Sequence, residues 1–117
     1  MLQFHASTTA EKNTMAYMLN GDVAAVIGTH CKALTSDERV LDKGTAFISD
    51  NGMIGSTISV GGFDAKNEIE KIMSAIPRRS KESWEGLELQ GVIVDIDDDN
   101  KASSIKRIRT GCKNPTR

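Results

Sequence analysis

Two histidines are the residues of this chain best placed to do chemistry. His30 closes the apolar stretch "DVAAVIGTH", and Cys31 and Lys32 follow it directly. The end of a buried strand is the usual position of a catalytic or ligand side chain on an open α/β sheet. His5 lies just before a predicted helix, whose N-terminus disfavours added positive charge and so favours the neutral, metal-binding imidazole. Two such imidazoles can share one metal ion, although structural roles are the other interpretation.

The neighbouring thiol and an acidic stretch near the C-terminus are weaker candidates. No upstream motif presents Cys31 as a nucleophile, and we expect a small, semi-buried side chain there. The stretch "DIDDDN" has the alternating aspartates of a calcium loop, but Lys106 stands where a bidentate glutamate is needed. A charged hairpin turn is the better interpretation of this stretch.

Two helices are predicted from their caps and their apolar spacing. The first lies within Thr8–Asp22, because Thr8 and Glu11 have the spacing of a capping box. The second lies within Asp64–Ile76, where Asp64 is a natural N-cap and the following proline ends the helix. Its apolar residues form one stripe: Ile69, Ile72, Met73 and Ile76.

The remaining segments predict short strands and a hairpin. The run 22–30 is continuously apolar, as in a strand covered on both faces. Two short strands are expected within 37–41 and 44–50, and a hairpin within 87–109. The glycine-rich segment 51–63 is expected to be a structured loop that buries its apolar side chains, namely Met53, Ile54, Ile58 and Val60. The order predicts one mixed α/β domain over residues 1–117.

Composition excludes several classes of function. The formal net charge is −1 at pH 7, so we expect no nucleic-acid partner. No window approaches the apolar length of a membrane span, and no signal-peptide pattern opens the chain, so we expect no membrane association. Two cysteines do not make a disulfide framework, which favours a reduced, cytoplasmic protein.

Three stretches together resemble a known family. "FHASTTAEK", "GDVAAVIGTHCKALTSDERVLDKGTAFISDNGMIG" and "GVIVDIDDDNKASSIKRI" are similar to the C-terminal half of the YmdB-type metallophosphoesterases, bacterial cytoplasmic phosphodiesterases that act on cyclic nucleotides. The resemblance implies part of a four-layer α/β sandwich in which two divalent metal ions (Fe, Mn or Mg) serve phosphodiester hydrolysis. It places the family's ligand histidines on His5 and His30, where they serve the same metal.

The resemblance also implies residues beside the site, and it shows departures. The candidates for substrate contact in the loops beside the site are Lys32, Asp37, Arg39, Asn51 and Gly52. Lys32 stands where the family has a second histidine, and a protonated lysine has no lone pair to give a metal. In the family's first motif, Gln3 and Ser7 replace an aspartate and a glutamate.

The expected function follows from this match and from what it lacks. We expect a truncated metal-dependent phosphodiesterase for a small phosphodiester or nucleotide, with its metal weakly held and with negligible hydrolysis on its own. The family's N-terminal half is absent from the match, so a complementing N-terminal half is an expected partner. The alternative is a non-catalytic remnant that serves as a binding or oligomerisation module. A half-sandwich should expose an apolar sheet face, which predicts a homo-oligomer.

Overall fold

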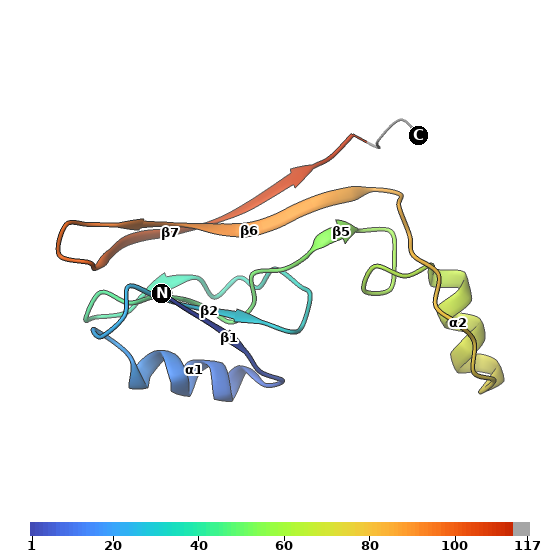
Figure 1. The fold of residues 1–117 in the computed structure, drawn as a ribbon, viewed down its shortest axis with the longest axis horizontal. Helices are drawn as coiled ribbons and strands as arrows, with labels where there is room; N and C mark the ends of the chain where they lie inside the picture. Colours follow the sequence, from blue (N-terminus) through green and yellow to red (C-terminus); the bar gives the residue numbers. More distant parts are fainter. Residues whose placement is uncertain (114–117) are drawn as a thin grey trace. The chain divides into compact units, whose positions relative to one another are not determined.

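The computed structural model describes residues 1–113, and the chain divides into two compact units. The first unit comprises residues 1–53 and 90–108, and the second comprises residues 54–89 with the residues that follow Ile108. Figure 1 labels most of the elements. In chain order they are β1 (Leu2–His5), α1 (Thr9–Met18), β2 (Ala25–Thr29), β3 (Arg39–Val40), β4 (Ala46–Ile48), β5 (Ile54–Ser56), α2 (Ala65–Ser74), β6 (Leu87–Ile96) and β7 (Ala102–Gly111).

The first unit contains a four-stranded sheet whose central strands run parallel. Its order is β1-β2-β4-β3, with β1 and β4 parallel to β2 and with β3 antiparallel to β4. His5 pairs with Thr29, and Ile27 pairs with Ile48. The carboxyl ends of three strands therefore meet at one edge, where His5, His30 and the residues after Ile48 lie close in space.

Both faces of this sheet are covered, as the apolar run 22–30 predicted. Helix α1 covers one face (Figure 1). There Val26 and Phe47 pack with Ala16 of this helix. On the other face, Ala25 and Ile27 of β2 and their counterparts on β4 pack with Ala102 of β7 and with valines of β6. The interior is built from small and branched aliphatic side chains, and Phe47 is its one fully buried aromatic ring among the described residues.

Both predicted helices form with the predicted N-caps. The Thr8 side chain accepts from the Glu11 amide at 3.2 Å, and the Glu11 carboxylate accepts from the Thr8 amide at 3.0 Å, which completes the capping box. Asp64 caps α2 by accepting from the Asn67 amide at 2.8 Å. With ten residues each, neither helix is long and apolar enough to cross a membrane.

The second unit exposes the apolar side chains that the sequence predicted to be buried in the loop. Ile54, Ile58 and Val60 are 77%, 64% and 50% exposed, so the prediction is wrong for these three, whereas Met53 is half-buried. The segment also contains the strand β5, where only a loop was predicted. The buried position of the segment belongs instead to Ser56, whose hydroxyl bonds to the Glu85 carbonyl at 2.5 Å. Hydrogen bonds rather than apolar contacts stabilise the inside of the loop, and its aliphatic side chains face solvent.

Candidate metal centre

The structure brings the two histidines together. Nε2 of His5 lies 3.1 Å from Nδ1 of His30, and the ring centroids are 4.9 Å apart with the rings nearly perpendicular. Nδ1 of His5 lies 3.0 Å from Oγ1 of Thr29, its register partner on β2. Both rings are exposed at the carboxyl edge of the sheet. Parallel pairing of β1 with β2 therefore places both imidazoles at one point.

The spacing of the two nitrogens fits a shared metal ion. Two imidazole nitrogens that each bind one ion at about 2.1 Å lie about 3 to 3.4 Å apart, which matches the His5–His30 distance. In the described part of the chain no group of three or more His, Cys, Asp or Glu side chains gathers to hold an ion. Stable protein sites recruit three or more ligands, so this pair is a partial donor set.

Backbone strain is concentrated at the loop that carries His30. His30 has φ 122° and Lys32 has φ 58°, values that side-chain-bearing residues rarely adopt. Between them the Cys31 amide donates to Oδ2 of Asp50 at 2.7 Å. Oδ1 of the same carboxylate accepts from the Gly52 amide at 3.0 Å. Asp50 thus ties the loop after β2 to the loop after β4.

Asp50 is held in turn by a buried lysine of α1. Nζ of Lys12 lies 3.3 Å from Oδ2 of Asp50, and both side chains are 1% exposed. Sequence analysis missed this pair, which joins residues 38 positions apart. Its one sequence signal was an aspartate two residues after the third parallel strand, at the same edge as the histidines.

The structure corrects the expectation for Cys31 and leaves its neighbour Lys32 exposed. Cys31 is exposed rather than semi-buried, because the strained turn at His30 carries it out of the sheet. Its Sγ lies 3.6 Å from Nζ of Lys12, at the edge of the buried ion pair. Lys32 is exposed in the same loop.

The other predicted loop residues hold the framework of the first unit. Asp37 accepts from the amide and the hydroxyl of Ser49, and Arg39 donates to Oδ1 of Asn13 at 2.7 Å. The guanidinium of Arg39 also lies 4.9 Å from the centre of the Phe47 ring. The Asn51 amide donates to the Gly28 carbonyl at 3.1 Å. Their contact with a substrate stays a prediction.

Gly52 is required by close packing. Its φ is 83°, and a Cβ at this position would approach the Gln90 side chain to 2.3 Å. Glycine is the residue that tolerates both the conformation and the contact.

We expect Asp37 to make stability depend on acid pH. Burial raises the pKa of Asp37, but hydrogen bonds from Ser49 and Thr35 outweigh it and lower the pKa below its ordinary value of 3.8. The ionised form therefore stabilises the fold fully above about pH 4, and this contribution is lost as pH falls through the depressed pKa. Urea unfolding of Asp37→Asn should show a weaker dependence on pH below 4 than the wild type. Equal slopes would show that the Asp37 contacts do not stabilise the fold.

We expect His30→Gly to stabilise the chain. A strained φ at a residue with a side chain costs on the order of 1–3 kcal/mol, and glycine removes most of it at an entropic cost of about 0.5–1 kcal/mol. Since the His30 side chain is exposed, little packing is lost and the free energy of unfolding should rise by about 1 kcal/mol in urea titrations. The control is His5→Gly, which introduces glycine into a strand and should lower stability. If the free energy of unfolding falls in both variants, the conclusion that the His30 backbone is strained is refuted.

Comparison with known proteins identifies the family. A model of the YmdB-like protein family matches residues 1–108. The chain belongs to the YmdB-like family. A relative, the 2′,3′-cyclic-nucleotide 2′-phosphodiesterase of Bacillus subtilis (strain 168), is 39% identical over 108 residues, which make up 92% of this chain and 41% of that protein. The resemblance drawn from the sequence is confirmed.

Two solved structures confirm the fold class. A novel phosphatase from Mycoplasma pneumoniae matches with a TM-score of 0.89 and 32% identity, over 98% of this chain and 42% of that one. A hypothetical protein from Thermus thermophilus matches with a TM-score of 0.87 and 25% identity, over 93% and 43%. The predicted mixed α/β class is confirmed. The chain spans about two fifths of the length of the Bacillus subtilis relative and of each of these two solved structures.

Proposed function

We propose that this chain is the histidine-bearing portion of a metal-dependent phosphodiesterase that acts on cyclic nucleotides. One observation carries the proposal: the imidazoles of His5 and His30 meet within 3.1 Å at the ends of adjacent parallel strands. The support for the substrate class is the name of the Bacillus subtilis relative, which is 39% identical to this chain.

Within this proposal the two imidazoles bind one divalent cation, of which Fe²⁺, Mn²⁺ and Mg²⁺ are the candidates. A bound ion supplies Lewis acidity toward a phosphodiester oxygen. Thr29 orients His5 through the bond to Nδ1, which leaves Nε2 to face His30. Asp50 holds the strained loop that presents His30. Lys32, exposed beside this pair, is a candidate to place positive charge near an anionic substrate.

The proposal requires ligands from outside the matched region. Two imidazoles fall short of the three or more protein ligands of a stable site. Since the chain spans 41% of the Bacillus subtilis relative, we propose that a segment equivalent to the rest of that protein completes the centre. Complementation then makes an active enzyme, and the chain alone is inactive.

Reconstitution tests this function. The chain is co-expressed with the part of the Bacillus subtilis relative outside the matched region, and hydrolysis of a 2′,3′-cyclic nucleotide is measured with Mn²⁺. We expect turnover from the combination, none from either part alone, and loss of turnover in His30→Ala but not in the control Tyr17→Ala, exposed on α1. Activity that survives His30→Ala would contradict the proposed role of the imidazoles.

A second candidate, an oligomerisation module, rests on the apolar face of α2. None of the residues of α2 is buried, and its polar side is engaged by ion pairs such as Glu70–Arg78 at 2.7 Å. Sedimentation should show concentration-dependent association that Ile72→Lys reduces, and a monomer at all concentrations would exclude this candidate. The exposed apolar residues on and just after the helix are Ile69 (58%), Ile72 (81%), Met73 (81%) and Ile76 (57%).

A further inference from the structure

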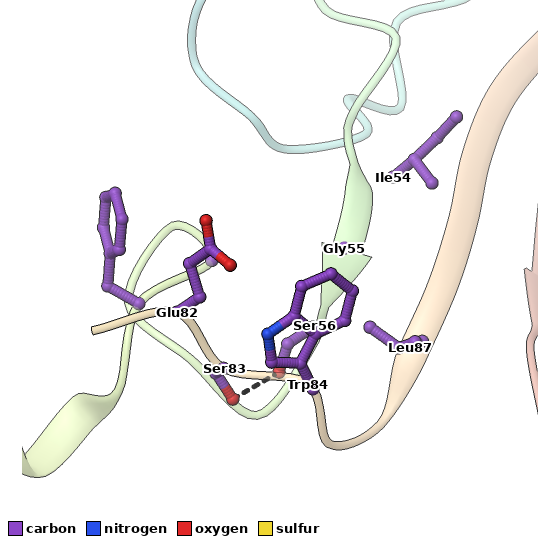
Figure 2. A pocket seen from close by; sticks show the side chains of 9 residues that line it. Ile54, Gly55, Ser56, Glu82, Ser83, Trp84 and Leu87 are labelled. Atoms are coloured by element: carbon purple, nitrogen blue, oxygen red, sulfur yellow. Dashed lines mark hydrogen bonds between the residues drawn. The ribbon is translucent and has the colours of Figure 1, made fainter. Parts of the chain in front are cut away.

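A pocket of about 280 Å³ opens in the second unit, whereas the histidine pair belongs to the first unit. Figure 2 shows the Trp84 indole at this pocket together with Ile54, Leu87 and the Glu82 carboxylate. Phe63 and two glycines, Gly55 and Gly62, also line it. The walls are aromatic, aliphatic or bare backbone, which are surfaces against which a flat ring can stack.

The polar groups of the pocket differ in whether they can still form hydrogen bonds with a ligand. The hydroxyls of Ser56 and Ser83 lie 3.0 Å apart, and each also bonds to a backbone carbonyl, so their donors are used within the loop. By contrast, no hydrogen bond or ion pair to another described residue engages the Glu82 carboxylate. An ionised carboxylate only accepts hydrogen bonds. The pocket therefore offers acceptors and stacking surfaces to its ligand.

These features select the chemistry of the occupant. A negatively charged group placed directly against Glu82 is repelled, and a purely apolar group would desolvate that carboxylate without giving it a partner. A ligand that satisfies the site is planar and presents neighbouring N–H donors on one edge. Among nucleobases guanine does so, because its N1–H and its exocyclic amine point the same way. Adenine sets a ring-nitrogen acceptor beside its amine, and that acceptor repels a carboxylate.

We propose that this pocket binds a guanine base, stacked on Trp84 and held by two N–H bonds to Glu82. Stacking of a base on an aromatic side chain supplies the sequence-tolerant part of the affinity. The two charge-assisted bonds from the Watson–Crick edge supply the preference for guanine. The proposal is independent of the metal centre, since the lining residues all belong to the second unit and the site binds without hydrolysis.

The chain provides its own reporter for this site. Trp84 is its single tryptophan, so the indole N–H gives one resonance in a ¹H–¹⁵N spectrum of the full chain. We expect guanosine 5′-monophosphate to shift this resonance saturably, with at least about tenfold higher affinity than the adenosine and cytidine monophosphates. The three probes carry the same phosphate, so their difference reports the base alone.

Substitutions separate the base contact from general charge. Glu82→Gln should abolish the preference for guanine, whereas Glu85→Gln, the same charge change at an exposed residue outside the lining, should retain it. Equal affinity for the three nucleotides, an unchanged preference in Glu82→Gln, or equally tight binding of L-argininamide would each overturn the proposal. The last result would assign the pocket to an arginine side chain of a partner protein.

Discussion

Removal of the Asp50 carboxylate should cost this chain about 3–5 kcal/mol of unfolding free energy, since breaking a buried ion pair leaves an uncompensated charge. Lys12 is 1% exposed, and its ammonium lies 3.3 Å from Oδ2 of Asp50. The same carboxylate accepts from the amides of Cys31 and Gly52. Asp50→Ala therefore leaves the buried Lys12 ammonium without its partner, and it removes the hydrogen bonds that hold two loops. Urea unfolding followed by circular dichroism measures the loss.

Two further variants give this prediction its controls. Asp98→Ala removes an exposed carboxylate from the β6–β7 turn and should change stability by less than about 0.5 kcal/mol. Lys12→Met replaces the ammonium with an apolar side chain of similar length and should cost a similar amount to Asp50→Ala, since it leaves the carboxylate unpaired. Wild-type stability in Asp50→Ala would contradict the role of this pair as the anchor of the His30 loop.

The second large effect is expected at Gly28, where two backbones approach closely. A Cβ on Gly28 would lie 1.9 Å from the Ser49 carbonyl oxygen and 3.0 Å from Cδ of Lys12. Since the blocking atom belongs to the backbone, β2 and the end of β4 must separate, and overpacking of this kind costs about 1–3 kcal/mol or more. Gly28→Ala should accordingly lower the urea midpoint and weaken the bond from the Asn51 amide to the Gly28 carbonyl.

The matched control for this substitution is Gly111→Ala. A Cβ on Gly111 would meet no atom of residues 1–113 within 4 Å, although Gly111 also lies in a strand. Its stability should therefore stay within about 0.5 kcal/mol of wild type. If both alanine variants unfold at the same urea concentration, the close approach at Gly28 carries no energetic weight.

Local signals in the sequence were sufficient to predict both helices and five of the strands, but they did not predict β1 or β5. Thr8 and Glu11 predicted the start of α1, and the apolar run 22–30 predicted a strand covered on both faces. These signals depend on neighbours three or four residues away, so they can be read from spacing alone. The parallel pairing of β1 with β2, which was not predicted, brings His5 and His30 together as the family resemblance implied.

Other features depended on contacts that spacing does not encode. Lys12 and Asp50 are 38 positions apart, and a lysine in an amphipathic helix normally faces solvent. Ile54 and Ile58 have the residue type of a core, yet Ser56 holds the buried position because its hydroxyl finds backbone partners. The exposure of Cys31 follows from the positive φ of His30, and the residue types in this stretch do not predict a positive φ.

The central claim, that His5 and His30 bind one cation together, is tested most directly by NMR with Mn²⁺. These are the only two histidines among the 117 residues, so a long-range ¹H–¹⁵N spectrum shows two imidazole systems. We predict that substoichiometric Mn²⁺ broadens both rings in parallel, and that His30→Ala largely protects the His5 ring from broadening. Broadening of one ring alone, of neither ring, or of His5 unchanged in His30→Ala would contradict the shared site.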